Sequence, residues 1–350
     1  MIIGYSFWGF LGNGVVDSPD GGRSHRLAWV RTLVGNGHRL IFLQRNRDLE
    51  EAGESYAEWG TWPADLPPID LLFLEWRWPI PGRNVEVSPS SQGYCPDWDR
   101  QAALLRFYTL DRGIPTLVWD KDLQLPQRSP LRGLPHIRIA EATRFPRPGA
   151  SSLLFPICGD WYRHAARELS KPAPDASFDL VYIGNQYDRD EHFERFFASA
   201  APQLRHGVFG KWTRVTNWPA VRFHSRIGYE QVSSVLRTSV ATPLLSPTRY
   251  CSAGQVTQRI FEAVLNGCFP LAPRDIIGID TLLPDDLLVA DGADVVRACK
   301  DLERLRRTPD YKPAILGCLS RLAPFLASAQ YETFAQIVSS FGRRNDDIRH

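Results

Sequence analysis

The chain has 350 residues, of which 43% are hydrophobic and 23% charged, and its formal net charge is +2. This length exceeds one ordinary hydrophobic core and suits two domains of about 150 residues each. No apolar run approaches the roughly 18–20 residues of a membrane helix. The composition therefore indicates a globular protein with no membrane partner, and the near-zero charge by itself identifies no ligand.

The cysteines and the N-terminal stretch indicate the cellular compartment of the protein. The six cysteines are far apart and form no CxxC pair, so the sequence indicates neither a zinc site nor a disulfide framework. Reduced thiols are expected. The stretch MIIGYSFWGF lacks the basic segment and the cleavage site of a signal peptide. We therefore expect a cytoplasmic protein.

The first half of the chain alternates short apolar strands with helices. Strands are expected at 1–7, 38–44, 69–76 and 114–120, with helices at about 24–36 and 97–112. A loop rich in Gly, Pro and Asp, GNGVVDSPDGGRSH, follows the first strand. Apolar strands separated by helices are typical of a parallel sheet that is covered on both faces.

The alternation restarts after RELSKPAPDASFD (167–179), a polar, proline-rich stretch that we interpret as a linker. Strands are expected at 178–185, 207–210, 239–246, 268–273 and 286–290, and helices at 190–201, 229–237, 256–266 and within 293–341. The expected fold is therefore α/β, with two doubly wound, Rossmann-like domains (1–166 and 167–325) facing a cleft, and a helix in 326–350 that packs back on the first domain. Ligands of such sheets bind where loops leave the carboxyl ends of the strands.

The most informative stretch is TQRIFEAVLNGCFPLAP, residues 257–273. Arg259 and Glu262 stand three residues apart near the start of an expected helix, on one face. A helix N-terminus favours anions, an arginine there can bind a diphosphate, and a glutamate one turn on can accept two ribose hydroxyls. Thr257 adds a hydrogen-bond donor. The alternative is a surface ion pair between Arg259 and Glu262 with no ligand.

Two aspartates, Asp120 and Asp122, follow the strand expected at 114–120, where a ligand site would lie. A hydroxyl that attacks carbon needs a proton acceptor within hydrogen-bond reach, because its own pKa is far above neutral. The alternative for this pair is an aspartate-rich turn or a helix cap. His25, in DGGRSHR, is a rival base, although a lone histidine in a loop is more often a surface residue.

Positive charge is concentrated in two stretches. Between Phe196 and Tyr229 there is no Asp or Glu, and the stretch carries Arg205, Lys211, Arg214, Arg222 and Arg226. Between Arg128 and Arg147 five arginines, Arg132 among them, accompany a single acid, Glu141. Arginine suits bidentate phosphate binding. A generally arginine-rich composition is the alternative explanation.

The quoted stretch resembles the nucleotide-binding segment of GT-B glycosyltransferases, in which an acidic residue holds the ribose of the sugar nucleotide. The similarity extends over FDLVYIGNQYDRDEHFERF, GVFGKWTR and RIGYEQVSSVLRTSVATPLLSPTRY, and in the first half over DLQLP (122–126). In this order the segments resemble the phage DNA β-glucosyltransferases, which transfer glucose from UDP-glucose to hydroxymethylcytosine in duplex DNA. The similarity covers roughly half of the chain, and no single motif in it is highly specific.

The resemblance implies roles for single residues. Glu262 would bind the ribose and Arg259 the diphosphate, with Thr257 and Gly184 completing the donor site. Arg189 resembles one of a pair of diphosphate arginines, at a spacing that differs by about two residues. The backbone of Ile227, after Arg226, would contact the uracil. Asp122 would be the general base, with Asp120 as its rival. Ser24 or His25 stands where the family has a sugar-contacting acid, which leaves the sugar open.

The implied protein is a monomeric, UDP-sugar-dependent glycosyltransferase, with UDP-glucose as donor, in a bacterium or a phage-infected host cell. The implied acceptor is a hydroxymethylated pyrimidine in duplex DNA, which requires phosphate contacts and a base that leaves the stack. The expected DNA contacts are Arg128, Arg132, Lys211, Arg214 and Arg222. Trp212 and Trp218 are interleaved with the cations of the first stretch; tryptophans can supply stacking, but most of them fill cores. No motif indicates a metal site, so a divalent ion is left open. The alternatives are a transferase for a small molecule or glycan, and a non-catalytic module that binds a nucleotide sugar or DNA.

Overall fold

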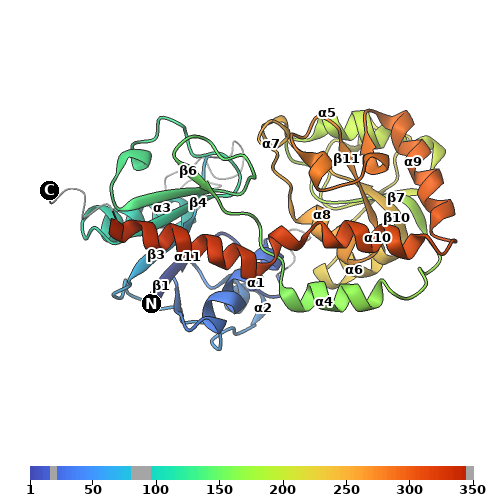
Figure 1. Cartoon of the computed structure of the whole chain (residues 1–350). Helices are drawn as coiled ribbons and strands as arrows, with labels where there is room; N and C mark the ends of the chain where they lie inside the picture. The colour runs from blue at the N-terminus through green and yellow to red at the C-terminus, as the bar shows by residue number, and fades with distance from the viewer. Residues whose placement is uncertain (16–21, 80–95, 344–350) are drawn as a thin grey trace. The chain divides into compact units, whose positions relative to one another are not determined.

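The structure is a computed structural model that describes residues 1–15, 22–79 and 96–343. The chain forms two compact units (Figure 1). Unit 1 comprises Met1–Val15, Arg26–Pro156 and Ala327–His350, and unit 2 comprises Val16–His25 and Ile157–Leu326. Each unit contains one six-stranded parallel sheet, so the expected α/β class is confirmed.

Unit 1 is built on a parallel sheet in the order β2-β1-β3-β4-β5-β6. Its strands are β1 (Ile2–Ser6), β2 (Arg39–Phe42), β3 (Leu71–Glu75), β4 (Thr116–Asp120), β5 (Ile137–Glu141) and β6 (Ala150–Ser152). Its helices are α1 (Arg23–Gly35), whose first three residues group with unit 2, α2 (Arg47–Ala52), α3 (Pro96–Leu104) and α11 (Ala327–Arg343). The α3 helix continues as a π-helical segment, Leu105–Leu110.

Both faces of this sheet are buried. On β3, Leu72 and Leu74 belong to a core cluster that includes Leu104 of α3. Phe73 packs on the other face against Trp29 of α1 and Phe334 of α11, with ring centres 5.8 and 5.6 Å away. Successive strand residues point to opposite faces. An uninterrupted apolar strand is therefore what a sheet covered on both faces requires.

Unit 2 repeats the architecture with the order β12-β11-β10-β7-β8-β9. Its strands are β7 (Phe178–Ile183), β8 (His206–Phe209), β9 (Phe223–His224), β10 (Ser239–Pro243), β11 (Phe269–Pro273) and β12 (Leu288–Val289). Its helices are α4 (Gly159–Glu168), α5 (Asp190–His192), α6 (Tyr229–Arg237), α7 (Thr248–Cys251), α8 (Gln258–Leu265), α9 (Gly292–Leu305) and α10 (Tyr311–Ser320). The short α5 continues as a π-helical segment, Phe193–Ala198.

The stretch interpreted as a linker lies inside unit 2 instead. The preceding helix α4 packs against α8 and α10. The buried side chain of Arg306 donates a hydrogen bond to the Pro174 carbonyl at 3.0 Å. These contacts hold the proline-rich segment against the domain, and the longer segment of unit 2 begins at Ile157.

Several elements differ from what the sequence pattern indicates. β5 and β9 were not expected, because IRIAE carries charge inside the strand and FH is only two residues long. α2 and α4 were also missed. Among the helices in the described ranges, none is both long and apolar enough to span a bilayer.

Candidate functional site

The order in which strands are added to the unit 2 sheet reverses between β7 and β10. The chain runs from β7 outward to β8 and β9, and β10 then pairs with the opposite edge of β7. The loops that follow β7 and β10 therefore diverge at the carboxyl ends of the strands, where doubly wound sheets bind ligands. A pocket of about 320 Å³ lies there, and its lining includes Arg189, Arg214, Ser246 and Thr248.

Two arginines meet at Tyr182, near the end of β7. The guanidinium of Arg259 lies 5.3 Å from the centre of the Tyr182 ring, and that of Arg189 lies 5.9 Å from it. Arg189 also donates a hydrogen bond to the Tyr182 hydroxyl, and Arg259 Nε donates one to the Ile183 carbonyl at 3.1 Å. These contacts place two positive side chains at one strand end through neutral groups. Such a pair suits an anion that carries more than one charge.

Gly184 makes room for this arrangement. A β-carbon at position 184 would lie 2.4 Å from Arg259 Nη2 and 2.9 Å from the Tyr182 hydroxyl oxygen. The neighbouring loop also approaches closely, since a β-carbon on Gly210 would lie 2.3 Å from the Gly184 carbonyl oxygen. A side chain at either position would therefore displace the loop or the guanidinium.

The helix α8 supplies the other expected donor residues. Thr257 is its N-cap residue, but the Thr257 side chain makes no capping hydrogen bond. Arg259 and Glu262 are both half-buried, whereas Ile260 and Phe261 are buried. Spacing of i and i+3 brings Arg259 and Glu262 to the same side of the helix. The arginine and the carboxylate are thus about one turn apart, beside the carboxyl end of β7.

His25 lies against the start of α8 and not on the surface. The residue is only 1% exposed, and its Nδ1 is hydrogen-bonded to the side-chain amide of Gln258. Ser24 beside it is also buried. A general base must approach the proton that it removes. The expectation of a surface histidine is therefore wrong, and the burial of His25 disfavours it as the base.

Arg226 and Ile227 precede Gly228, the N-cap residue of α6. Arg226 is exposed, while Ile227 is half-buried and packs against the core cluster that contains Val232 and Leu236. The side chain of Ile227 thereby anchors the backbone at this point.

In unit 1, Asp120 is fully buried at the end of β4. Its oxygens accept hydrogen bonds from the backbone nitrogens of Gln124 and Leu125, both at 2.8 Å, and from Arg147 Nη2 at 2.8 Å. Burial raises the pKa of Asp120, and the backbone hydrogen bonds and Arg147 offset this only in part. Asp120 therefore closes the turn that follows β4, as the alternative reading of an aspartate-rich turn has it.

Asp122 lies within that turn and is half-buried. The next residue, Leu123, has a φ of 56°, which side-chain-bearing residues rarely adopt. On the other side, Lys121 forms an ion pair of 2.7 Å with the fully buried Glu75. Asp122 is thus the more exposed of the two aspartates.

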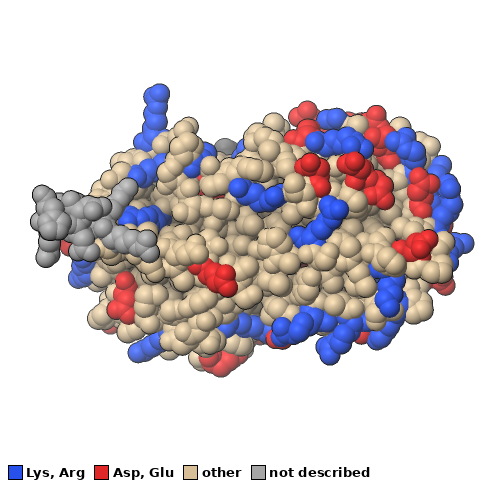
Figure 2. All heavy atoms as spheres, in the orientation of Figure 1, with Lys and Arg blue, Asp and Glu red and all other residues tan. Residues whose placement is uncertain are grey.

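Acids from elsewhere in the chain neutralise part of the first basic stretch. Arg205 pairs with Asp179, and Arg214 pairs with Asp190 at 2.6 Å. On the face drawn in Figure 2, acidic and basic side chains are interspersed over much of unit 2. Within this stretch, the exposed cations that form no ion pair with any described residue are Lys211, Arg222 and Arg226.

The tryptophans of this stretch are mostly structural. Trp218 is 7% exposed, and its ring centre lies 4.7 Å from that of Phe193. Trp212 packs against the same phenylalanine at 4.4 Å and donates a hydrogen bond to the Gly184 carbonyl at 2.8 Å. Trp218 therefore fills the core, the commoner of the two roles left open for the tryptophans, and is too buried to stack on nucleobases.

The second basic stretch is also largely structural. The Arg132 side chain is 12% exposed, pairs with the buried Glu141 at 3.0 Å and donates to the Pro126 carbonyl. Arg147 pairs with the same glutamate at 2.7 Å. This inward pairing removes Arg132 from the expected DNA contacts. Arg128 is exposed.

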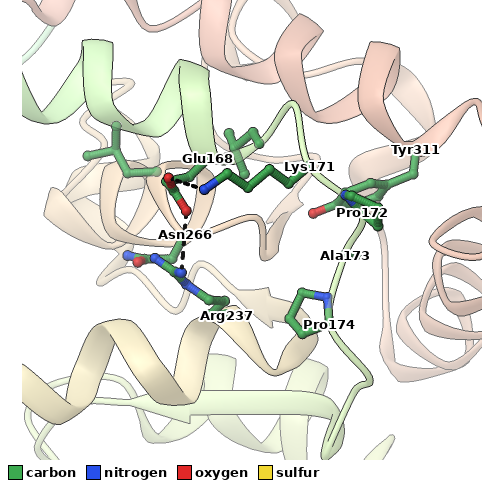
Figure 3. Close-up of a pocket in the computed structure, with 10 residues that line it drawn as sticks. Glu168, Lys171, Pro172, Ala173, Pro174, Arg237, Asn266 and Tyr311 are labelled. Atoms are coloured by element: carbon green, nitrogen blue, oxygen red, sulfur yellow. Dashed lines mark hydrogen bonds and ion pairs between the residues drawn. The ribbon is translucent and has the colours of Figure 1, made fainter.

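A second pocket, of about 210 Å³, lies at the opposite end of the unit 2 sheet (Figure 3). It is formed where α4, α6 and α8 end, and Tyr311 is part of its lining. Glu168 in this pocket accepts a hydrogen bond from Lys171 at 2.7 Å and lies 3.8 Å from Arg237. Its position at the amino ends of the strands separates it from the arginine pair.

Tyr182 is the site residue that sequence reasoning missed. It lies inside the apolar strand FDLVYI and there resembles an ordinary core residue. The available signal was its place as the next-to-last residue of a strand at the switch point. In the described ranges no group of three or more His, Cys, Asp or Glu side chains is arranged to hold a metal ion.

Comparison with known proteins places this site in context. Residues 189–318 match a family model described as glycosyl transferase-like. No curated protein matches the chain. T4 phage β-glucosyltransferase, solved with UDP-glucose, is similar with a TM-score of 0.62 and 14% identity over 97% of this chain and 99% of that one. This chain has the GT-B fold.

Other solved structures share that fold. AviGT4, a glycosyltransferase involved in avilamycin A biosynthesis, has a TM-score of 0.60 and 12% identity over 97% of each chain. An α-glucosyltransferase in complex with UDP-glucose and DNA containing an abasic site has a TM-score of 0.60 and 12% identity, over 96% of this chain and 98% of that one. Enzymes with different acceptors thus use one architecture.

Proposed function

We propose that the chain is a glycosyltransferase that uses a UDP-sugar, with UDP-glucose as the first donor to test. The observation that carries the proposal is the pair Arg189 and Arg259, which meet at Tyr182 at the switch point of unit 2. Two guanidinium groups can hold a diphosphate through charge-assisted hydrogen bonds. Glu262, about one turn along α8 from Arg259, accepts hydrogen bonds from the ribose hydroxyls. Structures of this fold solved with UDP-glucose support the choice of nucleotide.

The remaining donor contacts follow from the same loops. Gly184 lets Arg259 lie over the end of β7, and Thr257 supplies a hydroxyl at the start of α8. The main chain of Ile227, which Arg226 precedes, contacts the uracil. In this arrangement the nucleotide binds unit 2 through charge at the diphosphate and through hydrogen bonds at the ribose.

Asp122 is the proposed general base. The acceptor hydroxyl oxygen attacks the anomeric carbon, the bond from that carbon to the diphosphate oxygen breaks, and UDP leaves. Asp122 takes the hydroxyl proton. The burial of Asp120 and His25 and the hydrogen bonds that both make support this assignment.

The proposed acceptor is a hydroxymethylated pyrimidine in duplex DNA. Exposed Arg128, Lys211 and Arg222 support it, because phosphate contacts dominate the affinity of proteins for DNA. The base must leave the stack for its hydroxymethyl group to be reached. The second candidate is a small molecule or a glycan, since AviGT4, with the same fold, is involved in avilamycin A biosynthesis.

The donor is tested by calorimetry with UDP-glucose, UDP and uridine. Transfer is tested by incubating the protein with a panel of UDP-sugars and hydroxymethylated DNA, followed by mass spectrometry of the nucleosides. Both reactions are run with Mn²⁺ and with EDTA, because T4 phage β-glucosyltransferase has been solved with UDP and Mn²⁺. Failure to bind UDP would reject the proposal. Tight binding with no turnover on any acceptor would identify a non-catalytic module.

The DNA acceptor has a separate test. DNA affinity of the Arg128→Ala, Lys211→Ala, Arg222→Ala triple variant is measured against salt concentration. Each lost phosphate contact should lower the slope of log K against log salt by about 0.9. The matched control is Arg304→Ala, an exposed arginine on α9 that is already paired with Asp301. A triple variant with the wild-type slope would remove these residues from DNA binding and favour the smaller acceptor.

A further inference from the structure

We infer that Tyr182 is a positioning residue for diphosphate binding. Its hydroxyl orients Arg189 as a carboxylate would, but the hydroxyl is neutral. The inference rests on the proposed donor site. Tyr182 is fully buried, so it acts through the arginines and not by touching the ligand. Its hydroxyl accepts a hydrogen bond from Arg189 Nη1, and its ring lies below the guanidinium of Arg259.

The pairing of the neighbouring charges supports this role. Arg189 is flanked in sequence by Asp188 and Asp190, but each of these acids is engaged by another arginine. Asp188 pairs with Arg249, and Asp190 pairs with Arg214.

Arg189 itself donates to the Tyr182 hydroxyl and, through Nε, to the Tyr187 carbonyl at 2.7 Å. It forms no ion pair with any residue that the structure describes. The two adjacent aspartates therefore pair with other arginines, and the positive charge of Arg189 stays available to an anion.

The hydroxyl and the ring of Tyr182 have separable effects. The hydroxyl contacts Arg189, whereas the ring face attracts both guanidinium groups by a cation–π interaction. A phenylalanine keeps the ring and removes only the acceptor for Arg189. Tyr182→Phe should therefore disturb Arg189 and leave Arg259 in place.

The test is calorimetry of Tyr182→Phe with UDP, inorganic pyrophosphate and uridine. Affinity for UDP and for pyrophosphate should fall about tenfold, which is about 1.4 kcal/mol. Uridine affinity should stay within about twofold of wild type, because uridine carries no phosphate. The matched control is Tyr311→Phe, another buried tyrosine of unit 2, whose hydroxyl donates to the Gly267 carbonyl at 3.1 Å at the far end of the sheet. It should leave all three affinities unchanged.

A double-mutant cycle separates positioning from a general loss of structure. In an Arg189→Ala background, Tyr182→Phe should cost no further UDP affinity, whereas in an Arg259→Ala background it should keep its full effect. Arg189→Lys retains the charge but loses the fork geometry, so it should weaken UDP about as much as Tyr182→Phe. This variant tests the inference even if Tyr182→Phe does not fold.

Three results would overturn the inference: unchanged UDP affinity in folded Tyr182→Phe, an equal loss for uridine, or wild-type UDP affinity in Arg189→Lys. If the wild-type protein binds neither UDP nor pyrophosphate, the proposed function fails and the inference fails with it. If wild type binds both and the variants are silent, only the inference fails.

Discussion

Replacing Gly184 with alanine should weaken diphosphate binding while it leaves the fold intact. The new methyl carbon would lie 2.4 Å from Arg259 Nη2, whereas ordinary contact begins at 3.4 Å. The guanidinium must therefore move by about 1 Å. The backbone of Gly184 lies outside the left-handed region, so alanine introduces no backbone strain. The new carbon would also lie 2.9 Å from the Tyr182 hydroxyl, which accepts a hydrogen bond from Arg189, so the substitution acts on both arginines of the pair.

The size of the effect follows from this displacement. A hydrogen bond to a charged group contributes about 1.5–3 kcal/mol. Loss of one such bond between Arg259 and the diphosphate should lower UDP affinity by about 10- to 100-fold. The cost to folding should be about 1–2 kcal/mol, because the guanidinium of Arg259 can move aside but the hydroxyl of the buried Tyr182 must also shift.

The assay is calorimetry with UDP and uridine, together with denaturant unfolding of the same preparations. Gly317→Ala in α10 is the matched control, since a β-carbon there would meet no atom within 4 Å. It should raise the free energy of unfolding by about 0.5–1 kcal/mol and leave UDP binding unchanged. If Gly184→Ala binds UDP as wild type does, or loses uridine and UDP equally, the assignment of Arg259 to the diphosphate is refuted.

Three other changes test the site and its surroundings. Glu262→Ala should weaken UDP and uridine alike by about 1–3 kcal/mol in calorimetry, because both carry the ribose; unchanged affinity in a folded variant would reject that role. Asp122→Asn should lower turnover at least about 10²-fold without changing donor affinity, whereas Asp120→Asn should mainly lower the free energy of unfolding; the reverse result would make Asp120 the base. Burial lowers the pKa of His192 from its usual 6.5, so unfolding measured by denaturant should become easier as the pH falls below that value, and His192→Gln should reduce this dependence.

Elements with a clear apolar pattern could be predicted from the sequence. The helix at 229–237 has the expected bounds, and β3 and β4 lie within the expected apolar runs. β5 could not be predicted in the same way, because Arg138 interrupts its pattern. That side chain instead donates hydrogen bonds to Ser340 of α11, 202 residues away. A partner so distant in sequence leaves no local signal.

Only part of the candidate site could likewise be predicted from the sequence. Arg259 and Glu262 could be identified because their spacing on one helix is a local property. The surroundings of Asp120 and Asp122 could not, because the two aspartates are equivalent in sequence until Arg147 and the backbone of the turn engage one of them. The basic stretch between Phe196 and Tyr229 contains no acid, but acids outside it neutralise some of its cations. Asp190, which pairs with Arg214, is an example that the sequence of the stretch alone cannot reveal.

The choice of partner for an arginine decides what the arginine can bind. Two unit charges about 4 Å apart interact by about 4 kcal/mol at an effective dielectric constant of 20. A carboxylate in the place of the Tyr182 hydroxyl would hold Arg189 at least as firmly, but it would also repel an incoming diphosphate by an energy of that order. The neutral hydroxyl orients the guanidinium without this repulsion. The ion pairs of Arg214 and Arg249 with the aspartates that flank Arg189 have the complementary effect, because they keep these carboxylates engaged.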